Sequence, residues 1–424
     1  MVSAVLFITF FVLLVLNVPI AVCLGLSSAA AILYSGTSLT IVATNIYSGI
    51  SKFLLLAIPF FVLSGNIMAK AGISTRLIRF VDTCVGHRKG GIANVCIIVA
   101  CFFGAISGSG PATVAALGAV LIPAMVERGG FSAAFSTALM ATSSSIAIVI
   151  PPSIAFVVYA SITGVSIGDM FMAGIIPGIL MGLALVVVVM LEVRRNHVMP
   201  SNVEKASAKE RWNAFKDAFW GFLMPIIILG GIYGGFFTPT EAAAVSVVYG
   251  LFVGMVIYKE VKFKDLWEIL IDSAKTTGGI MLIVACASLF SFVCTRFGIS
   301  TAASELLARV AGNQFTFLLI CNIIFLIAGC FIDANSAMYI FIPIMLPVCK
   351  ALGYNVIAFG IMATVNLAIG QVTPPVGVNL FVAIGIKLRD GIRVTLQEIS
   401  RAVVPMVAAS IAVLLIITYI PQIS

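Results

Sequence analysis

Polar residues that could bind ligands gather at four interruptions of otherwise apolar sequence. The first two are the turn from Ser107 to Pro111 and the run from Thr142 to Ser145, which is followed by Pro151-Pro152. The other two lie further along the chain, at Asp333 to Ser336 and at Asn366 to Pro375. Hydroxyl, amide and carbonyl oxygens are the ligands that hard cations prefer. We therefore expect these four segments to form an ion- and solute-binding site.

The glycines and prolines of these segments favour interrupted helices. Proline removes a backbone donor and biases the preceding residue away from the helix, which frees carbonyl oxygens near Ile148. Asp333 is the one acidic residue that we place within the membrane, where an ionisable group is a functional candidate by default. Its alternative role is to cap the helix that follows it, and the two roles are compatible. For a single Ser or Thr, packing or a bond to its own helix is the commoner role, whereas four matched interruptions favour binding.

The same segments contain no Lys or Arg. An anionic substrate would therefore be held by helix N-termini, hydroxyls and amides, and bound cations would supply the positive charge. An enzyme within the membrane would need a nucleophile with a base, or a metal centre. The only histidines, His87 and His197, lie in basic loops, and Asp333 has no second carboxylate in these segments. We therefore expect a transporter and not an enzyme, with no organic cofactor.

The composition indicates which solvent surrounds these segments. Of the 424 residues, 61% are hydrophobic and only 9% are charged, whereas a typical soluble domain has about 25% charged residues. Apolar runs of spanning length recur, for example Phe171 to Leu191, Phe219 to Phe236 and Val403 to Ile420. The nine cysteines form no CxxC pair, so neither a disulfide framework nor a zinc site is indicated. We expect a multi-pass protein in membrane lipid, with no nucleic-acid partner.

The chain contains an internal repeat. Gly72 to Thr75 and Gly298 to Thr301 both read GIST. Each copy is followed by a short polar segment within apolar sequence and then by a double proline. Landmarks that recur in the same order predict two structural repeats, residues 1–192 and 219–424, joined by a polar linker at 193–218. Each repeat is expected to hold five spanning helices, one re-entrant helical hairpin and one broken helix. The hairpins are expected at about 91–127 and 314–350, and the broken helices at about 131–162 and 355–385.

The hairpin interpretation depends on length. Gly91 to Ile106 and Pro111 to Val126 have 16 residues each, which gives about 24 Å of helix, too short to span the membrane comfortably. Short amphipathic arms, Thr37 to Tyr47 and Lys259 to Asp272, are expected to lie in the membrane interface before the third spanning helix of each repeat. Because each repeat then has an odd number of spans, the two repeats must be inverted.

The basic residues test the inversion independently. If the loop from Arg76 to Lys89 is cytoplasmic, then the linker and the regions Lys259 to Lys264 and Lys387 to Arg401 are cytoplasmic too, together with Lys70, Arg128 and Lys275. Only four of the 24 basic residues then lie outside, namely Lys52, Arg296, Arg309 and Lys350. Both termini are then expected on the periplasmic side of a bacterial inner membrane.

Four stretches resemble the large membrane subunit of tripartite ATP-independent periplasmic (TRAP) transporters, above all its sialic-acid members. They are SGSGPAT at Ser107 to Thr113, SSSIAIVIPPS at Ser143 to Ser153, TPTEAAA at Thr238 to Ala244 and GQVTPPVGVNL at Gly370 to Leu380. The resemblance covers essentially the whole chain. It implies an elevator mechanism, in which a transport domain of hairpins and broken helices slides against a scaffold. It also implies sodium coupling, a small four-helix membrane subunit and a periplasmic substrate-binding protein.

The resemblance also assigns roles to the candidate residues. One sodium site is expected at Ser107 and Ser109 with the break at Ser145, Ile148 and Pro151. A second is expected at Gly329 and Asp333 with Gly370 and Thr373. We assign the substrate to Thr142, Ser143, Ser144, Asn335, Ser336, Asn366 and Gln371.

The expected function is sodium-coupled import of a small organic acid that the binding protein delivers. Sialic acid is the first candidate, and a four-carbon dicarboxylate or another organic acid is the alternative. The rivals from other classes are an intramembrane enzyme and a channel.

Overall fold

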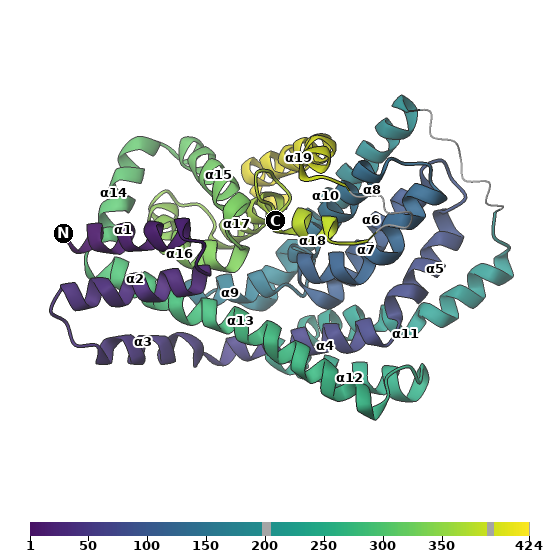
Figure 1. The fold of residues 1–424 in the computed structure, drawn as a ribbon, viewed down its shortest axis with the longest axis horizontal. Helices are drawn as coiled ribbons and strands as arrows, with labels where there is room; N and C mark the ends of the chain where they lie inside the picture. Colours follow the sequence, from purple (N-terminus) through teal and green to yellow (C-terminus); the bar gives the residue numbers. More distant parts are fainter. Residues whose placement is uncertain (197–204, 388–393, 424) are drawn as a thin grey trace.

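The protein is built from helices, and none of the described residues forms a strand (Figure 1). The computed structural model describes residues 1–196, 205–387 and 394–423. Within these ranges, nine helices are long and apolar enough to cross a membrane. The prediction of an all-helical, multi-pass membrane protein is therefore confirmed.

The first half of the chain, up to residue 196, finishes with a helical hairpin, a broken helix and one long helix. In chain order they are α1 (Val2–Val15), α2 (Ile20–Tyr34), α3 (Thr40–Ile50), a 3-10 turn (Phe53–Leu56), α4 (Ala57–Lys70), α5 (Ile73–Val85), α6 (Gly91–Ser107), α7 (Gly110–Glu127), α8 (Ala133–Ser145), a 3-10 turn (Ile146–Ile148), α9 (Ile154–Thr163) and α10 (Ile167–Arg195). The helices α6 and α7 form the first hairpin, and α8 and α9 form the first broken helix.

The helices from residue 208 onward follow the same order. They are α11 (Ala208–Tyr233), α12 (Pro239–Phe252), a π-helical turn (Val253–Ile257), α13 (Phe263–Arg296), α14 (Ile299–Ala311), α15 (Gln314–Phe331), α16 (Ala334–Ala351), α17 (Val356–Gly370), α18 (Val378–Ile384), α19 (Leu396–Tyr419) and a final 3-10 turn (Pro421–Ile423). The helices α15 and α16 form the second hairpin, and α17 and α18 form the second broken helix.

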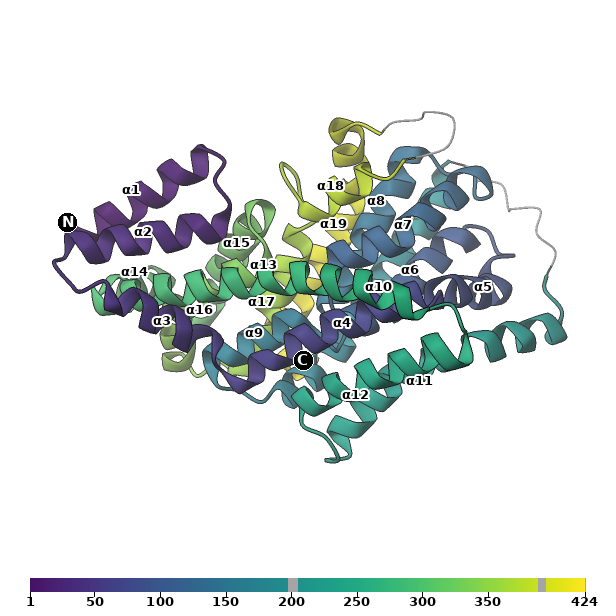
Figure 2. The ribbon, with the colours of Figure 1, turned by 60° about the horizontal axis from the view of Figure 1, so that its bottom comes forward.

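The two broken helices lie at the centre of the molecule. Every side chain of α8 from Phe135 to Ser145 is buried, as is every side chain of α17 from Ala358 to Gly370. Around them, α8 packs on α7 and α19, and α17 packs on α15 and α10, so elements of both halves interleave. The long helix α13 crosses the molecule and contacts α2, α3 and α4 as well as α16 (Figures 1 and 2). The hairpins and broken helices thus form an inner bundle, and α13 is part of the frame beside it.

Helix length does not separate hairpin helices from spanning helices, contrary to expectation. The first hairpin has helices of 17 and 18 residues and the second has two of 18, so three of the four reach the length of a spanning helix. Meanwhile α1 and α2, outside the hairpins, have only 14 and 15 residues. The hairpins are distinguished instead by their position directly before a broken helix and by the packing of α6 on α8 and of α15 on α17.

The repeated GIST motif begins a helix in each half, which the interpretation of Arg76 to Lys89 as a loop overlooked. Gly72 and Gly298 stand immediately before α5 and α14 with positive φ values of 68° and 70°, a conformation that glycine adopts without steric cost. The motif is therefore a helix-start signal, and only the end of the expected loop lies outside the helix.

The interfacial arms differ between the halves. In the first half, the arm α3 is separated from α4 by residues 51–56, which include the 3-10 turn. In the second half, arm and spanning segment form one helix, α13, of 34 residues, about 51 Å long. No proline or glycine interrupts the chain between Asp272 and Thr277, so the helix has no reason to end there.

The expected linker at 193–218 is helical at both of its ends. The helix α10 continues to Arg195, and α11 begins at Ala208, where Ser207 and Glu210 form a capping box. Residues 197–204 of this linker, and residues 388–393 of the expected cytoplasmic region after Lys387, lie outside the described residues.

Candidate functional site

Glycine and proline shape the turn of the first hairpin. Gly108 ends α6 in the left-handed region (φ 61°), which favours a residue without a side chain. Ser109 is extended (φ −137°), and Pro111 lies in the first turn of α7, where a missing N–H costs no helix bond. The free N–H groups at the N-terminus of α7 therefore lie at the tip of the hairpin.

Asp333 closes the turn of the second hairpin. Its Oδ2 accepts hydrogen bonds from the backbone N–H groups of Asn335 (3.0 Å) and Ser336 (3.1 Å). Its Oδ1 accepts one from the hydroxyl of Ser336 (2.5 Å). The capping role of Asp333 is confirmed, because it is the N-cap of α16. The hydroxyl of Ser336 serves the same cap, so it is engaged within the hairpin.

Each hairpin packs against the broken helix of its own half through residues with small side chains or none. A Cβ atom built on Gly104 of α6 would lie 2.7 Å from the Cα of Ala147, in the turn after α8. A Cβ atom built on Gly370 would lie 2.5 Å from the Cα of Gly329 of α15. Helix backbones can approach this closely only where side chains are absent or small. The two expected sodium-site glycines, Gly329 and Gly370, are therefore in direct contact.

Backbone contacts also join the tips to the breaks. The carbonyl oxygen of Pro152 lies against Gly108, 2.7 Å from where a Cβ atom would be. Pro151, an expected sodium ligand, precedes Pro152 through a cis peptide bond. In the second half, the backbone N–H of Gly377 donates to the carbonyl oxygen of Cys330 (3.1 Å). Tips and breaks thus form one unit in each half.

The two hairpin tips meet at a cavity of about 270 Å³. Its lining includes Gly108 to Pro111, Ile148, Asp333 to Asn335 and Gln371, together with Thr276, Ile280 and Ile283 of α13. Among these described lining residues there is no Lys or Arg, and Asp333 is the only acid. The N-terminus of α7 opens here, whereas that of α16 is already capped by Asp333, and an uncapped helix N-terminus favours negative charge. The cavity therefore suits a small solute that carries a carboxylate.

Three buried side-chain oxygens near this cavity accept no hydrogen bond from a described residue. They are Asn335 Oδ1, Gln371 Oε1 and Asn379 Oδ1. Both Gln371 and Asn379 lie against Gly110 of the first tip, within 3.3 Å of the position that a Cβ atom would take. An unpaired buried acceptor costs about 1–3 kcal/mol, so these oxygens favour a ligand that brings hydroxyl groups or a cation.

Asn379 was not among the expected site residues. It is the only polar side chain of α18, VNLFVAI, and it is fully buried. Its amide nitrogen donates weakly to the carbonyl oxygen of Ala141 on α8, at 3.4 Å, so it joins the two halves. A lone asparagine in an apolar helix directly after the double proline was the signal that could have identified it.

Oxygen atoms cluster inside the first tip. The hydroxyl oxygens of Ser107 and Thr113 lie 2.9 Å apart, and Thr113 also donates to the backbone oxygen of Ser109 (2.8 Å). A second cavity of about 360 Å³ is lined by Ser107 and Ser109 on one side and by α4 and α13 on the other. The cluster supplies the oxygen ligands that a hard cation needs. Thr113 was missed as a ligand although SGSGPAT contains it.

The hydroxyls of the first break mostly serve their own helix. Thr142 donates to the carbonyl oxygen of Ala138, and Ser144 to that of Met140, both at 2.8 Å. Ser145 donates to the carbonyl oxygen of Thr142, also at 2.8 Å. Hydroxyls in membrane helices commonly bond back in this way. None of the three lines the cavity between the tips, and their expected roles in binding gain no support from this geometry.

Ser143 is also fully buried and lies outside the cavity lining. Its hydroxyl oxygen has no hydrogen-bond partner among the described residues. In the second break, the Thr373 hydroxyl donates to the carbonyl oxygen of Ile369 (2.7 Å), which leaves the oxygen's lone pairs but not its proton available.

Asn366 faces away from the tips. Its amide nitrogen donates to Asn322 Oδ1 of α15 (2.5 Å), and Asn322 in turn donates to the Thr418 hydroxyl of α19 (3.3 Å). All three side chains are buried, and Asn366 does not line the cavity. The amide network holds α15, α17 and α19 together, so the expected substrate contact of Asn366 is absent from this arrangement.

Eight of the sixteen expected ligands take part neither in the two cavities nor in the glycine contact: Thr142, Ser143, Ser144, Ser145, Pro151, Ser336, Asn366 and Thr373. The other eight fall into two groups. The structure brings six of them to the two cavities: Ser107, Ser109, Ile148, Asp333, Asn335 and Gln371. Two more, Gly329 and Gly370, form the hairpin–break contact of the second half.

Comparison with known proteins identifies the architecture. The family model described as "Tripartite ATP-independent periplasmic transporter, DctM component" matches residues 7–423. The chain belongs to this family. Within the TRAP family, it is 41% identical to a C4-dicarboxylate TRAP transporter large permease protein of Pseudomonas aeruginosa, over 95% of this chain and 92% of that protein. It is 35% identical to a sialic acid TRAP transporter large permease protein of Vibrio cholerae, over 93% of this chain and 90% of that protein.

One solved structure shares the fold. The Alcanivorax borkumensis YdaH transporter superposes with a TM-score of 0.63 over 92% of this chain and 89% of that chain, at 12% sequence identity. The TRAP membership means that the chain is a permease of the bacterial membrane and not an enzyme. Organic-acid uptake is therefore its general task, and the hairpin tips are the structural features that its mechanism must explain.

Proposed function

We propose that this TRAP permease imports a small organic acid together with sodium ions, and that the acid binds between the two hairpin tips. The observation that carries the proposal is the cavity of about 270 Å³ in which both tips, Gln371 and the helix α13 meet. Discontinuous helices in matching places of two repeats are typical of substrate and ion sites in secondary transporters.

The first sodium site is assigned to the oxygen cluster of the first tip. Ser107, Ser109 and Thr113 contribute two hydroxyls and a carbonyl within hydrogen-bond distance of one another. Ile148 lies nearby in the cavity wall, although its carbonyl oxygen already accepts a hydrogen bond from the Ser153 hydroxyl (2.5 Å). The donor set of neutral oxygens fits a hard monovalent cation better than a proton, since none of these groups titrates near neutral pH.

The second sodium site is assigned to the matching contact of the second half. Gly329 and Gly370 bring the end of α15 against the end of α17. Asp333 supplies the only negative charge nearby, but its oxygens also cap α16. Backbone carbonyl oxygens with Thr373 would therefore supply most of the ligands, and Asp333 would add long-range attraction for the cation.

The lining of the cavity supports sialic acid as the first candidate substrate. The unpaired acceptors of Asn335 and Gln371 in the lining, and of Asn379 behind Gly110, suit the hydroxyl groups of a sugar acid. The N-terminus of α7, which no side chain caps, suits a single carboxylate. A dicarboxylate would bring a second negative charge into a lining without Lys or Arg, and it would offer no donor to the amide oxygens.

A four-carbon dicarboxylate is the alternative, because a C4-dicarboxylate permease is the more similar of the two relatives described above. In that case the bound sodium ions must neutralise the second carboxylate. The two candidates differ in how they would use the amide oxygens, which makes Gln371 and Asn379 the residues that discriminate between them.

The proposal includes an elevator motion of the inner bundle. The substrate cavity lies where the hairpin tips face Thr276, Ile280 and Ile283 of α13, so sliding of the bundle along α13 would expose it to either side. The family implies a periplasmic binding protein that delivers the acid and a small membrane subunit that braces the frame.

The test is uptake by proteoliposomes that contain the permease, its small subunit and its binding protein. Sialic acid should accumulate only with an inward sodium gradient, and excess succinate should compete poorly. Uptake driven by a proton gradient in sodium-free buffer would contradict the sodium coupling. Preferential uptake of succinate would be consistent with the same mechanism but would show that the substrate is a four-carbon dicarboxylate.

A further inference from the structure

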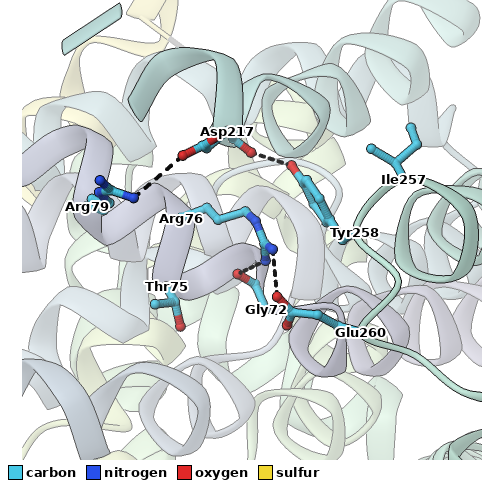
Figure 3. Close-up of a pocket in the computed structure, with 8 residues that line it drawn as sticks. All are labelled: Gly72, Thr75, Arg76, Arg79, Asp217, Ile257, Tyr258 and Glu260. Atoms are coloured by element: carbon cyan, nitrogen blue, oxygen red, sulfur yellow. Dashed lines mark hydrogen bonds and ion pairs between the residues drawn. The ribbon is translucent and has the colours of Figure 1, made fainter. Parts of the chain in front are cut away.

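A charged pocket of about 510 Å³, which shares no residue with the cavities at the hairpin tips, lies between α5, α11 and the turn that joins α12 to α13 (Figure 3). It is lined by Gly72, Thr75, Arg76, Arg79, Asp217, Ile257, Tyr258 and Glu260. The pocket lies where apolar helices pass into charged sequence, since α11 is apolar only after Asp217 and the π-helical turn ends at Ile257. This is the position of the headgroup layer, on the side that the basic residues mark as cytoplasmic.

Arg76 lines the pocket and already makes three hydrogen bonds within the protein. It donates to the carbonyl oxygens of Ala71 (3.1 Å) and Gly72 (3.0 Å) and to Glu260 Oε1 (2.6 Å). Its guanidinium also lies 3.9 Å from the centre of the Tyr258 ring. Arg76 therefore links α5 to the segment that precedes α13, and its charge is already balanced by Glu260 without a ligand.

Arg79 and Asp217 form the open side of the pocket. Their closest atoms are 3.6 Å apart, which is too long for a hydrogen bond, and their side chains are 70% and 53% exposed. Figure 3 shows the two groups facing each other across the mouth of the pocket, with the hydroxyl of Tyr258 donating to the backbone oxygen of Asp217 (2.6 Å). The guanidinium of Arg79 and the carboxylate of Asp217 thus lie side by side, and both can still form hydrogen bonds with a ligand.

The charges of the lining cancel. Arg76 and Arg79 balance Asp217 and Glu260, so the pocket has no net attraction for a simple anion. A ligand with a phosphate for Arg79 and an ammonium for the carboxylates would match both signs, because arginine binds phosphate through paired hydrogen bonds.

The ammonium must be a primary amine. Carboxylates accept hydrogen bonds from a primary ammonium, which a quaternary ammonium cannot donate. Recognition of a quaternary ammonium favours an exposed aromatic face, and one face of the Tyr258 ring is already occupied by the guanidinium of Arg76. Apolar side chains on the adjoining helices, such as Phe252 and Val256, are exposed and could accompany acyl chains.

We propose that this pocket binds the phosphoethanolamine headgroup of a membrane lipid, with the phosphate on Arg79 and the ammonium on Asp217 and Glu260. The lipid would then fill the gap between α5, which leads into the first hairpin, and α11, which belongs to the frame. The site is independent of the transported substrate and of the sodium sites.

The experiment is native mass spectrometry of the full-length chain with added phospholipids of identical acyl chains. Phosphatidylethanolamine should remain bound at lower concentration than phosphatidylcholine or phosphatidylglycerol. Arg79→Gln and Asp217→Asn should each raise the concentration for half-occupancy at least tenfold. Lys216→Gln is the matched control, because Lys216 is exposed on α11 beside Asp217 but does not line the pocket.

Three results would overturn the assignment. Equal binding of phosphatidylcholine would remove the requirement for a primary amine. Tighter binding of phosphatidylglycerol, weakened equally by Arg79→Gln and Lys216→Gln, would indicate a general basic surface. Equally tight binding of water-soluble glycerophosphoethanolamine would assign the pocket to a soluble solute. Because Arg79 is exposed and its ion pair is long, unchanged thermal unfolding of Arg79→Gln should accompany the loss of lipid.

Discussion

Gly329 and Gly370 lie back to back, so that a Cβ atom on Gly370 would stand 2.5 Å from the Cα and 2.6 Å from the carbonyl carbon of Gly329. Those atoms belong to a helix backbone and cannot swing away as the end of a side chain could. Gly370→Ala should therefore force α15 away from α17, at a cost of about 1–3 kcal/mol. We expect a lower midpoint of thermal unfolding in detergent and loss of sodium-dependent uptake.

Gly278→Ala is the control for this substitution. Gly278 lies within α13, and a Cβ atom there would meet nothing within 4 Å. Alanine is the better helix former by about 1 kcal/mol, so this variant should be as stable as the parent or slightly more so. If Gly370→Ala unfolded at the same temperature as Gly278→Ala and kept its uptake, the close contact between α15 and α17 would be disproved.

Ser107→Ala should weaken sodium binding. The substitution removes one of the two hydroxyls that cluster at the first tip while leaving the backbone turn intact. Loss of one cation ligand should raise the sodium concentration for half-maximal uptake roughly tenfold, and saturating sodium should restore most activity through the coupling of the two ligands. Uptake measured across a range of external sodium concentrations is the readout.

Ser145→Ala provides the comparison for the sodium prediction. The Ser145 hydroxyl is fully buried and donates to the carbonyl oxygen of Thr142 within its own helix. Its loss should change the sodium dependence little. A larger shift for Ser145→Ala than for Ser107→Ala would move the first sodium site from the hairpin tip to the break.

Gln371→Ala should weaken binding of a hydroxylated acid. The Gln371 side chain lines the substrate cavity, and its oxygen has no partner among the described residues. A lost hydrogen bond to a substrate hydroxyl of about 1–1.5 kcal/mol corresponds to a change of roughly tenfold in apparent affinity. High sodium should not restore it fully, because the substrate contact itself is missing. An unchanged half-maximal sialic acid concentration would exclude Gln371 as a contact.

Asn366→Ala should act on stability rather than on substrate affinity. The substitution leaves Asn322 Oδ1 without its closest donor inside the bundle of α15, α17 and α19. An unsatisfied buried group costs about 1–3 kcal/mol, so the midpoint of thermal unfolding should fall by several degrees. The apparent substrate affinity of the folded fraction should change far less than in Gln371→Ala. The opposite pattern would return Asn366 to the substrate site.

Gln371 and Asn366 were both expected to contact the substrate, but only Gln371 lines the substrate cavity. This difference shows which features the sequence can predict. Glycine, proline and the double-proline landmarks act locally, so the hairpin turns and both breaks could be placed to within a few residues. The Thr238–Glu241 capping box at the start of α12 is equally local. In contrast, α17 is buried on all sides, so no polar face reveals which neighbour Asn366 points toward.

The two residues that were missed differ in range. Thr113 contacts Ser107 and Ser109, which lie six and four residues before it in the same hairpin turn, so spacing along the chain could have identified it. Asn379 becomes part of the site only because α18 of one half packs on α8 of the other. That juxtaposition does not follow from spacing along the chain, since it depends on how separate helices pack.

Labelling of introduced cysteines tests the predicted topology. Lys209, at the start of α11, and Glu305, on α14, are both exposed and lie on opposite sides of the membrane if the repeats are inverted. Seven of the nine native cysteines are buried, and Cys84 is one of the two more accessible ones, so a Cys84→Ser background reduces native reactivity. In intact cells, an impermeant maleimide should label Glu305→Cys but not Lys209→Cys, and permeabilisation should make both reactive. Labelling of both positions in intact cells would place α11 and α14 on the same side, which an odd number of spans between them forbids.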